Sequence, residues 1–180
     1  MTTPKLLGIS GSLRAESFNS KLLREAASRF GPAAFTEGNL RLPLYDGDLE
    51  AQGIPAEVQT LADQIAAADA VIIASPEYNQ SFTGVLKNAL DWVSRVEGKP
   101  WQDKPVAIIG AAAGRSGGAR SAYALRLAMM PFQAQVLPGP EVLVAGAFRE
   151  FDEAGALTGE SYQEILDALM AKLRAAATAA

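Results

Sequence analysis

Gly11-Ser12-Leu13-Arg14-Ala15-Glu16-Ser17-Phe18-Asn19-Ser20 is the stretch around which the chain is organised. The apolar run Leu6-Leu7-Gly8-Ile9 precedes it, and apolar residues at helical spacing follow it from about residue 18 to residue 30. The stretch therefore predicts a loop that connects a first strand to a first helix.

The polar groups of this loop suit a phosphate. They are the hydroxyls of Ser10, Ser12, Ser17 and Ser20, the amide of Asn19 and the guanidinium of Arg14. A helix N-terminus adds free backbone N–H groups and a partial positive charge, and an arginine forks across two phosphate oxygens. A polar turn that only caps the helix, with Arg14 in solvent, fits this stretch equally well.

The overall composition indicates which classes of macromolecular partner are not expected. The chain has 180 residues, of which 49% are hydrophobic, and a net charge of −4 with no basic block. We therefore expect neither nucleic acid nor an acidic membrane as a partner. No apolar run approaches the roughly 18 residues that a membrane helix requires, and no signal peptide is recognised, so we expect a cytoplasmic protein.

The chain contains no cysteine and no histidine. Disulfides, thiolate metal sites, a cysteine nucleophile and a serine–histidine triad are thereby excluded, and we expect no metal site. We also expect no catalytic side chain, so that a bound cofactor carries any chemistry.

The pattern of apolar runs predicts alternating strands and helices. Strands are expected at residues 5–9, 33–40, 70–74 and 105–111, with a fifth at 136–137 or 142–144. Helices are expected at 18–30, from Pro55, and at 84–96, 119–130 and 160–175. This alternation predicts one α/β domain over residues 1–180, with 175–180 as a frayed alanine-rich tail. We expect a doubly wound parallel sheet of five strands in the order 2-1-3-4-5, with helices on both faces.

Two further loops are expected to meet the first one at the carboxyl edge of this sheet, where ligands of such folds bind. Pro76-Glu77-Tyr78-Asn79 follows the third strand and offers an aromatic face and an amide. Gly114-Arg115-Ser116-Gly117-Gly118 follows the fourth strand and lets backbone approach a ligand closely. The chain contains neither the dinucleotide fingerprint nor the phosphate loop of nucleotide hydrolases.

Four motifs in order resemble those of the NADPH-dependent FMN reductase family, a flavodoxin-like group that includes quinone, chromate and azo-dye reductases. They are Gly11-Ser12-Leu13-Arg14 with Ser17 and Asn19; Leu42-Pro43-Leu44-Tyr45-Asp46; Ser75-Pro76-Glu77-Tyr78-Asn79-Gln80-Ser81 with Gly84 and Leu86-Lys87-Asn88-Ala89-Leu90-Asp91-Trp92; and Gly117-Gly118-Ala119-Arg120. The resemblance covers residues 5 to about 145.

The resemblance implies an FMN cofactor, NADPH or NADH as electron donor, and a small acceptor such as a quinone, chromate, an azo compound or free flavin. A flavodoxin-like electron carrier without enzymatic activity is the alternative. Such carriers usually rely on a strongly acidic surface, and −4 over 180 residues is a modest charge.

The resemblance also implies a set of cofactor-binding residues. Ser12, Arg14, Ser17 and Asn19 would hold the phosphate, Phe18 would shape that loop, and Pro76, Glu77, Tyr78 and Asn79 would border the flavin ring. Ser10, Ala112, Gly114 and Gly117 complete the set. The family commonly has serine or threonine where this chain has Ala111-Ala112-Ala113, so backbone N–H groups near Ala112 to Gly114 must replace those hydroxyl contacts.

The expected helix at 119–130 has almost no wholly polar face, which together with the resemblance predicts a homodimer or homotetramer. Trp92 lies off the apolar stripe of the preceding helix, so that it belongs either to the core or to a subunit contact. Tyr123 and Glu141 are candidates for polar contacts between subunits.

Overall fold

The computed structural model describes residues 3–179, which form a six-stranded sheet in which every pair of neighbouring strands is parallel. The strands are β1 (Lys5–Ser10), β2 (Ala34–Gly38), β3 (Ala70–Ala74), β4 (Pro105–Ala112), β5 (Gln135–Val136) and β6 (Val142–Ala145). The order β2-β1-β3-β4-β5 confirms the predicted topology.

The fifth position of the sheet differs from the prediction, because two short strands share it. β5 pairs with the beginning of β4, at Pro105 and Val106, and β6 pairs with its end, from Ile109 to Ala112. The segment between β5 and β6 contains Pro138 and Pro140, and proline has no N–H for a sheet ladder. Both of the segments considered for the fifth strand are therefore strands.

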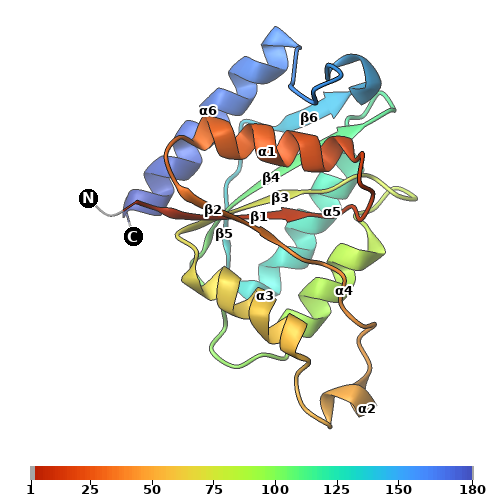
Figure 1. Cartoon of the computed structure of the whole chain (residues 1–180), viewed down its shortest axis with the longest axis vertical. Coiled ribbons are helices and arrows are strands. Elements are labelled where there is room, and N and C mark those ends of the chain that lie inside the picture. The colour runs from red at the N-terminus through yellow and green to blue at the C-terminus, as the bar shows by residue number, and fades with distance from the viewer. Residues whose placement is uncertain (1–2, 180) are drawn as a thin grey trace.

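Helices cover both faces of the sheet (Figure 1). On one face lie α1 (Phe18–Phe30) and α6 (Glu160–Ala179), and on the other lie α3 (Ala56–Ala67), α4 (Gly84–Val93) and α5 (Ala119–Met129). Short helical turns complete the chain: α2 (Gly47–Glu50), η1 (Met130–Phe132) and η2 (Ala147–Arg149). None of the helices in the described part of the chain combines the length and apolar character needed to cross a bilayer.

The last helix is longer than predicted. It continues to Ala179, where the sequence suggested a frayed tail from about residue 175, and Ala177 packs into the core beside α1. Ala180, the end of that tail, lies outside the described residues.

Trp92 belongs to the core. Its side chain is fully buried, and its Nε1 donates a hydrogen bond to the Pro43 carbonyl at 2.8 Å. Asn88 donates to the same carbonyl at 2.9 Å and accepts from the Tyr45 N–H at 2.8 Å. These two side chains of α4 fasten the loop that follows β2. The motif Leu86–Trp92 and the motif Leu42–Asp46, which are separate in the sequence, are thus in direct contact in the structure.

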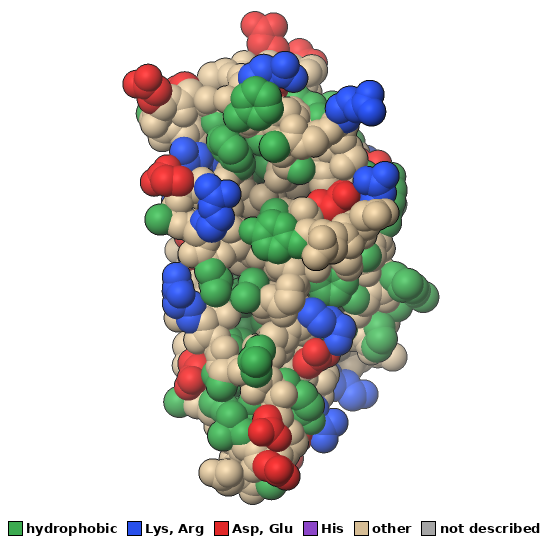
Figure 2. All heavy atoms as spheres, turned by 90° about the vertical axis from the view of Figure 1, so that its right-hand side faces the viewer, with side chains coloured by type: hydrophobic (Ala, Val, Ile, Leu, Met, Phe, Trp, Pro, Cys, Tyr) green, Lys and Arg blue, Asp and Glu red, His purple; other side chains and the backbone are tan. Residues whose placement is uncertain are grey.

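Hydrogen bonds join the loops that follow β1 and β3. The Gly11 N–H donates to the Ala74 carbonyl at 2.7 Å, and the Thr83 hydroxyl donates to the Gly11 carbonyl at 2.7 Å. The Ser75 N–H donates to the Ile109 carbonyl at 3.1 Å, which ties the second loop to β4. The carboxyl edge faces the reader in Figure 2, where apolar and charged side chains are interspersed.

Gly117 allows the loop after β4 to pack against β6. Its φ is +60°, and a Cβ there would collide with the Leu143 carbonyl oxygen, whereas a Cβ on Gly114 would meet nothing within 4 Å. Only glycine adopts this backbone at low cost in so tight a contact.

Gly117→Ala is therefore expected to destabilise the protein by about 2 kcal/mol or more, because left-handed strain and the contact with Leu143 add together. For a chain of this size the melting temperature should fall by about 4–8 °C. Thermal unfolding followed by circular dichroism measures this. Gly114→Ala is the matched control and should melt within about 2 °C of the native protein; equal melting of both variants would contradict the packing argument.

Candidate functional site

A pocket of about 230 Å³ opens at the carboxyl edge of the sheet, between the loops that follow β1, β3 and β4. Its lining consists of Ser12, Arg14, Ser17, Phe18, Asn19, Pro76, Glu77, Tyr78, Ala111, Ala112 and Ala113. The structure thus brings together most of the residues that the sequence assigned to a cofactor.

The first loop supplies an anion-binding end. Ser17 is the N-cap of α1 and accepts from the Asn19 N–H at 3.2 Å. Arg14 is exposed on the rim, and its guanidinium makes no ion pair within residues 3–179. A charged fork beside the positive end of a helix is suited to a phosphate monoester.

The Asn19 side chain is held by the backbone of β4. Its side chain is buried, its Nδ2 donates to the Ala111 carbonyl at 2.8 Å, and its Oδ1 accepts from the Ala111 N–H at 3.0 Å. Both polar atoms of the side chain are thus engaged by backbone, so Asn19, which lines the pocket, also braces its wall.

The Glu77 carboxylate is fully engaged in hydrogen bonds that hold two loops of the site together. One oxygen accepts from the Arg120 N–H at 3.1 Å and the Ser116 hydroxyl at 3.3 Å, and the other pairs with the Arg120 guanidinium at 3.2 Å. The carboxylate lies at the N-terminus of α5, where negative charge is favourable. It therefore joins the loop after β3 to the loop after β4.

Tyr78 presents a half-exposed ring beside the pocket. A tight turn holds it: Tyr78 and Ser81 exchange two backbone hydrogen bonds of 3.0 and 3.1 Å, with Asn79 and Gln80 at φ +50° and +66°. Asparagine tolerates this left-handed backbone better than most residues. Asn79 consequently shapes the turn and does not line the pocket.

Three other predicted residues lie outside the pocket lining. Ser10 shares a hydrogen bond of 2.8 Å with the Ser20 hydroxyl, so both hydroxyls are occupied within the first loop. Gly117 is buried against β6, and the Gly114 carbonyl accepts from the N–H groups of Gly117 and Gly146. These three residues support the loops.

The sequence did not reveal a set of buried hydroxyls behind the pocket. Ser121 on α5 donates to Ser75 at 3.0 Å, and Thr83 caps α4 while bonding the first loop. The position of Thr83 immediately before a helical apolar pattern is an N-cap signal that points to such a role. Ala111 and Ala113 also line the pocket. The sequence analysis noted them only as positions where the family commonly has serine or threonine.

The pocket fits one end of FMN. The Arg14 guanidinium and the α1 N-terminus match its phosphate, and the Tyr78 ring at the pocket rim offers a flat surface on which the rest of the cofactor can lie. A volume of about 230 Å³ is below the roughly 300–1,000 Å³ of pockets that enclose a whole ligand. The cofactor must therefore extend from the pocket over the open edge of the sheet.

Comparison with known proteins decides the family. Residues 4–149 match the family described as NADPH-dependent FMN reductase. The chain belongs to this family. It is 44% identical over 164 residues to a Pseudomonas aeruginosa protein named NAD(P)H-dependent FMN reductase, with 90% of this chain and 89% of the relative covered. It is 41% identical over 144 residues to the quinone reductase of Escherichia coli K12, with 77% and 76% covered.

Among solved structures, the flavoenzyme NAD(P)H:(acceptor) oxidoreductase FerB from Paracoccus denitrificans superimposes with a TM-score of 0.89 at 29% identity. The superposition covers 98% of each chain. The family, the fold and the pocket chemistry agree: this chain is an FMN-binding oxidoreductase that uses NAD(P)H.

Arg14→Ala is expected to weaken FMN binding by about ten- to a hundred-fold, because a charge-assisted hydrogen bond contributes roughly 1.5–3 kcal/mol. Quenching of FMN fluorescence during titration into apoprotein measures the dissociation constant. Arg115→Ala is the matched control, since Arg115 is exposed on the glycine loop and does not line the pocket. An Arg14→Ala protein that binds as tightly as the control would remove Arg14 from the site.

Proposed function

We propose that the protein catalyses two-electron reduction of a small quinone by NAD(P)H, with FMN held at the carboxyl edge of the sheet. The observation that carries this proposal is the convergence of three loops on a pocket that has the exposed Arg14 guanidinium beside a helix N-terminus. The quinone reductase of Escherichia coli, 41% identical, supports quinone as the acceptor class.

The overall reaction balances without an acid or base from the chain. NAD(P)H and one proton convert a quinone to its hydroquinone, the hydride and the proton supplying the two hydrogens. When bound, FMN supplies the two-electron chemistry that this chain, with neither cysteine nor histidine, does not offer.

The residues of the chain bind and orient the reactants. Arg14 and the N-terminus of α1 hold the phosphate, while the open edge beside Tyr78 leaves room for a donor or an acceptor. Asn19 and Glu77 fix the loops, and this positioning is the contribution that the protein makes to the rate.

Purified protein loaded with FMN should oxidise NADPH rapidly when a benzoquinone is added, with one quinone consumed for each NADPH. The loss of NADPH absorbance per quinone added gives the stoichiometry. The assay is run without oxygen, so that quinone is the sole electron acceptor. A flavodoxin-like electron carrier would bind FMN but leave NADPH unoxidised, and that result would contradict the proposal.

We further propose that the protein is a homodimer or homotetramer joined through the outer side of α5. Tyr123 and Leu127 on α5 are 54% and 69% exposed, and Met130 at the start of η1 is 71% exposed. Exposed apolar side chains at such helical spacing mark interaction sites. The Tyr123 hydroxyl donates to the Glu141 carboxylate of the same chain at 3.1 Å. The two residues predicted to form polar contacts between subunits are therefore bonded to each other within one chain, at the edge of the proposed surface.

We propose the cytoplasm as the compartment, on the ground that the family depends on NAD(P)H as a freely diffusing electron donor. Cell fractionation tests this proposal: activity should appear in the fraction released without detergent, and activity confined to washed membranes would contradict it.

Leu127→Glu is expected to dissociate the assembly, since a carboxylate would enter an apolar contact. Multi-angle light scattering should give a multiple of 18.9 kDa for the native protein and 18.9 kDa for the variant. Ala171→Glu, on an exposed position of α6, introduces the same charge on the other face of the sheet and should leave the mass unchanged. A native mass of 18.9 kDa would refute the assembly.

A further inference from the structure

A second pocket lies at the opposite end of the sheet from the candidate FMN site. It is formed by the end of α4, the segment that leads into β4, and the η1 turn after α5, and its volume is about 220 Å³. Its lining is Val93, Ser94, Val96, Lys99, Pro100, Trp101, Pro131, Phe132 and Gln133. β4 separates the two pockets by its length of eight residues, roughly 25 Å, so no small ligand contacts both.

Trp101 is the unusual residue of this pocket. Its side chain is 2% exposed, yet its Nε1 has no hydrogen-bond partner in the described part of the chain. The other tryptophan, Trp92, is equally buried and donates to the Pro43 carbonyl. A buried N–H without an acceptor is costly, so an acceptor from outside the chain, either a water or a ligand, would stabilise Trp101.

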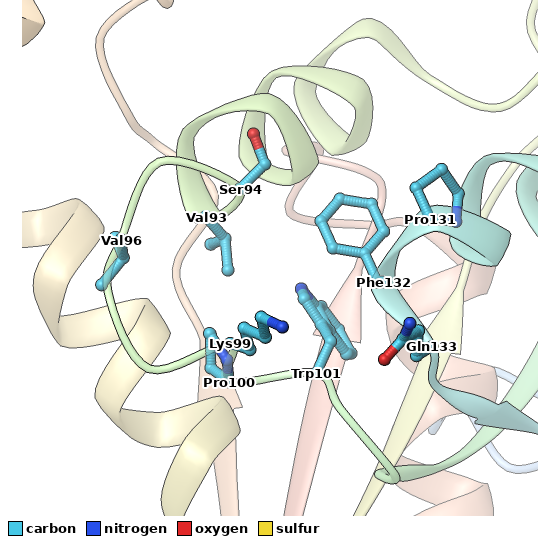
Figure 3. Close-up of a pocket in the computed structure, with 9 residues that line it drawn as sticks. All are labelled: Val93, Ser94, Val96, Lys99, Pro100, Trp101, Pro131, Phe132 and Gln133. Atoms are coloured by element: carbon cyan, nitrogen blue, oxygen red, sulfur yellow. The ribbon is translucent and has the colours of Figure 1, made fainter.

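The indole nitrogen is directed into the pocket. In Figure 3 the nitrogen end of the ring points to the space between Val93 and Phe132, and the Lys99 side chain extends in the direction of the indole. Lys99 is exposed and makes no ion pair within residues 3–179. Its backbone has φ +48°, an uncommon conformation for a residue other than glycine.

The remaining lining defines the body of the ligand. Val93, Val96 and two prolines are apolar, and the Phe132 ring meets the Trp101 ring edge to face with centroids 6.3 Å apart. Aromatic rings add to such edge-to-face clusters favourably. A volume of about 220 Å³ is smaller than that of pockets for drug-sized ligands, roughly 300–1,000 Å³, so the body is a single ring.

We propose that this pocket binds a small aromatic carboxylate, whose ring packs between Val93 and Phe132 and whose carboxylate accepts from Trp101 Nε1 and faces the Lys99 ammonium. A carboxylate satisfies an N–H donor and a cation together, which a neutral aromatic molecule does not. Phe132 is only partly buried and lies on the η1 turn, so its ring adjusts to admit the ligand. This site is independent of the proposed reaction.

Benzoate is the probe, and the indole N–H groups are the reporters. The chain has two tryptophans, so protein loaded with FMN and labelled with ¹⁵N gives two indole signals, which Trp101→Phe assigns. Benzoate should shift the Trp101 signal saturably and leave the Trp92 signal in place. A Trp101 signal that does not move as benzoate rises into the millimolar range would overturn the proposal, as would equal shifts of both signals.

Two comparisons test the carboxylate. Lys99→Ala should weaken benzoate binding about two- to five-fold, the range for an exposed ion pair, while Lys172→Ala on the exposed face of α6 should leave it unchanged. Benzamide, which lacks the charge, should bind the native protein more weakly than benzoate does. Its affinity should be the same for the native protein and the Lys99→Ala variant. Equal affinity for benzamide and benzoate would refute recognition of a carboxylate.

Discussion

The paired hydrogen bonds between Asn19 and Ala111 are the interaction on which the candidate site depends. The ladder between β3 and β4 ends with the bond from the Ser75 N–H to the Ile109 carbonyl. Two residues further along β4, Ala111 would have an unpaired N–H and carbonyl, and the Asn19 carboxamide meets both. The side chain acts as an additional peptide group. Because the first turn of α1 carries it, it holds the end of the pocket formed by the first loop against the wall formed by β4. Glu77 makes the corresponding connection between the loop after β3 and the start of α5.

Much of this arrangement is predictable from the sequence. Continuous apolar runs such as Ala70–Ala74, which is short and rich in β-branched residues, indicate strands buried on both faces, and their order along the chain determines which loops meet. The roles of individual polar residues are harder to predict. Asn19 and its partner are 92 residues apart, so nothing near Asn19 in the sequence distinguishes a backbone partner from a phosphate. The length of α6 was underestimated for a related reason, since alanines do not show in the sequence whether another element covers them. The Trp101 pocket left no sequence signal, because the missing acceptor becomes apparent only once the surrounding backbone is in place.

The two ends of α4 and α5 therefore serve different purposes. Their first turns carry Thr83, Ser121 and the backbone that Glu77 caps, all of which support the candidate FMN site. Their last turns contribute Val93 and lead into the η1 turn at the Trp101 pocket. Between them lie the exposed apolar side chains of Leu127 on α5 and Met130 at the start of η1. One pair of helices thus connects cofactor binding, the proposed assembly surface and a second binding site in a family whose chemistry resides in the cofactor.

The sheet divides the apolar interior into two separate cores. Residues of α1 and α6 pack on one face around Leu22 and Met170, and residues of α3, α4 and α5 pack on the other around Ile65 and Leu125. Side chains on opposite faces do not share packing partners, and substitutions at separate sites without shared partners contribute nearly additively to the free energy of unfolding. The two cores can therefore be redesigned independently and then combined, with the face beneath α1 and α6 open to modification without altering the side that carries the Trp101 pocket.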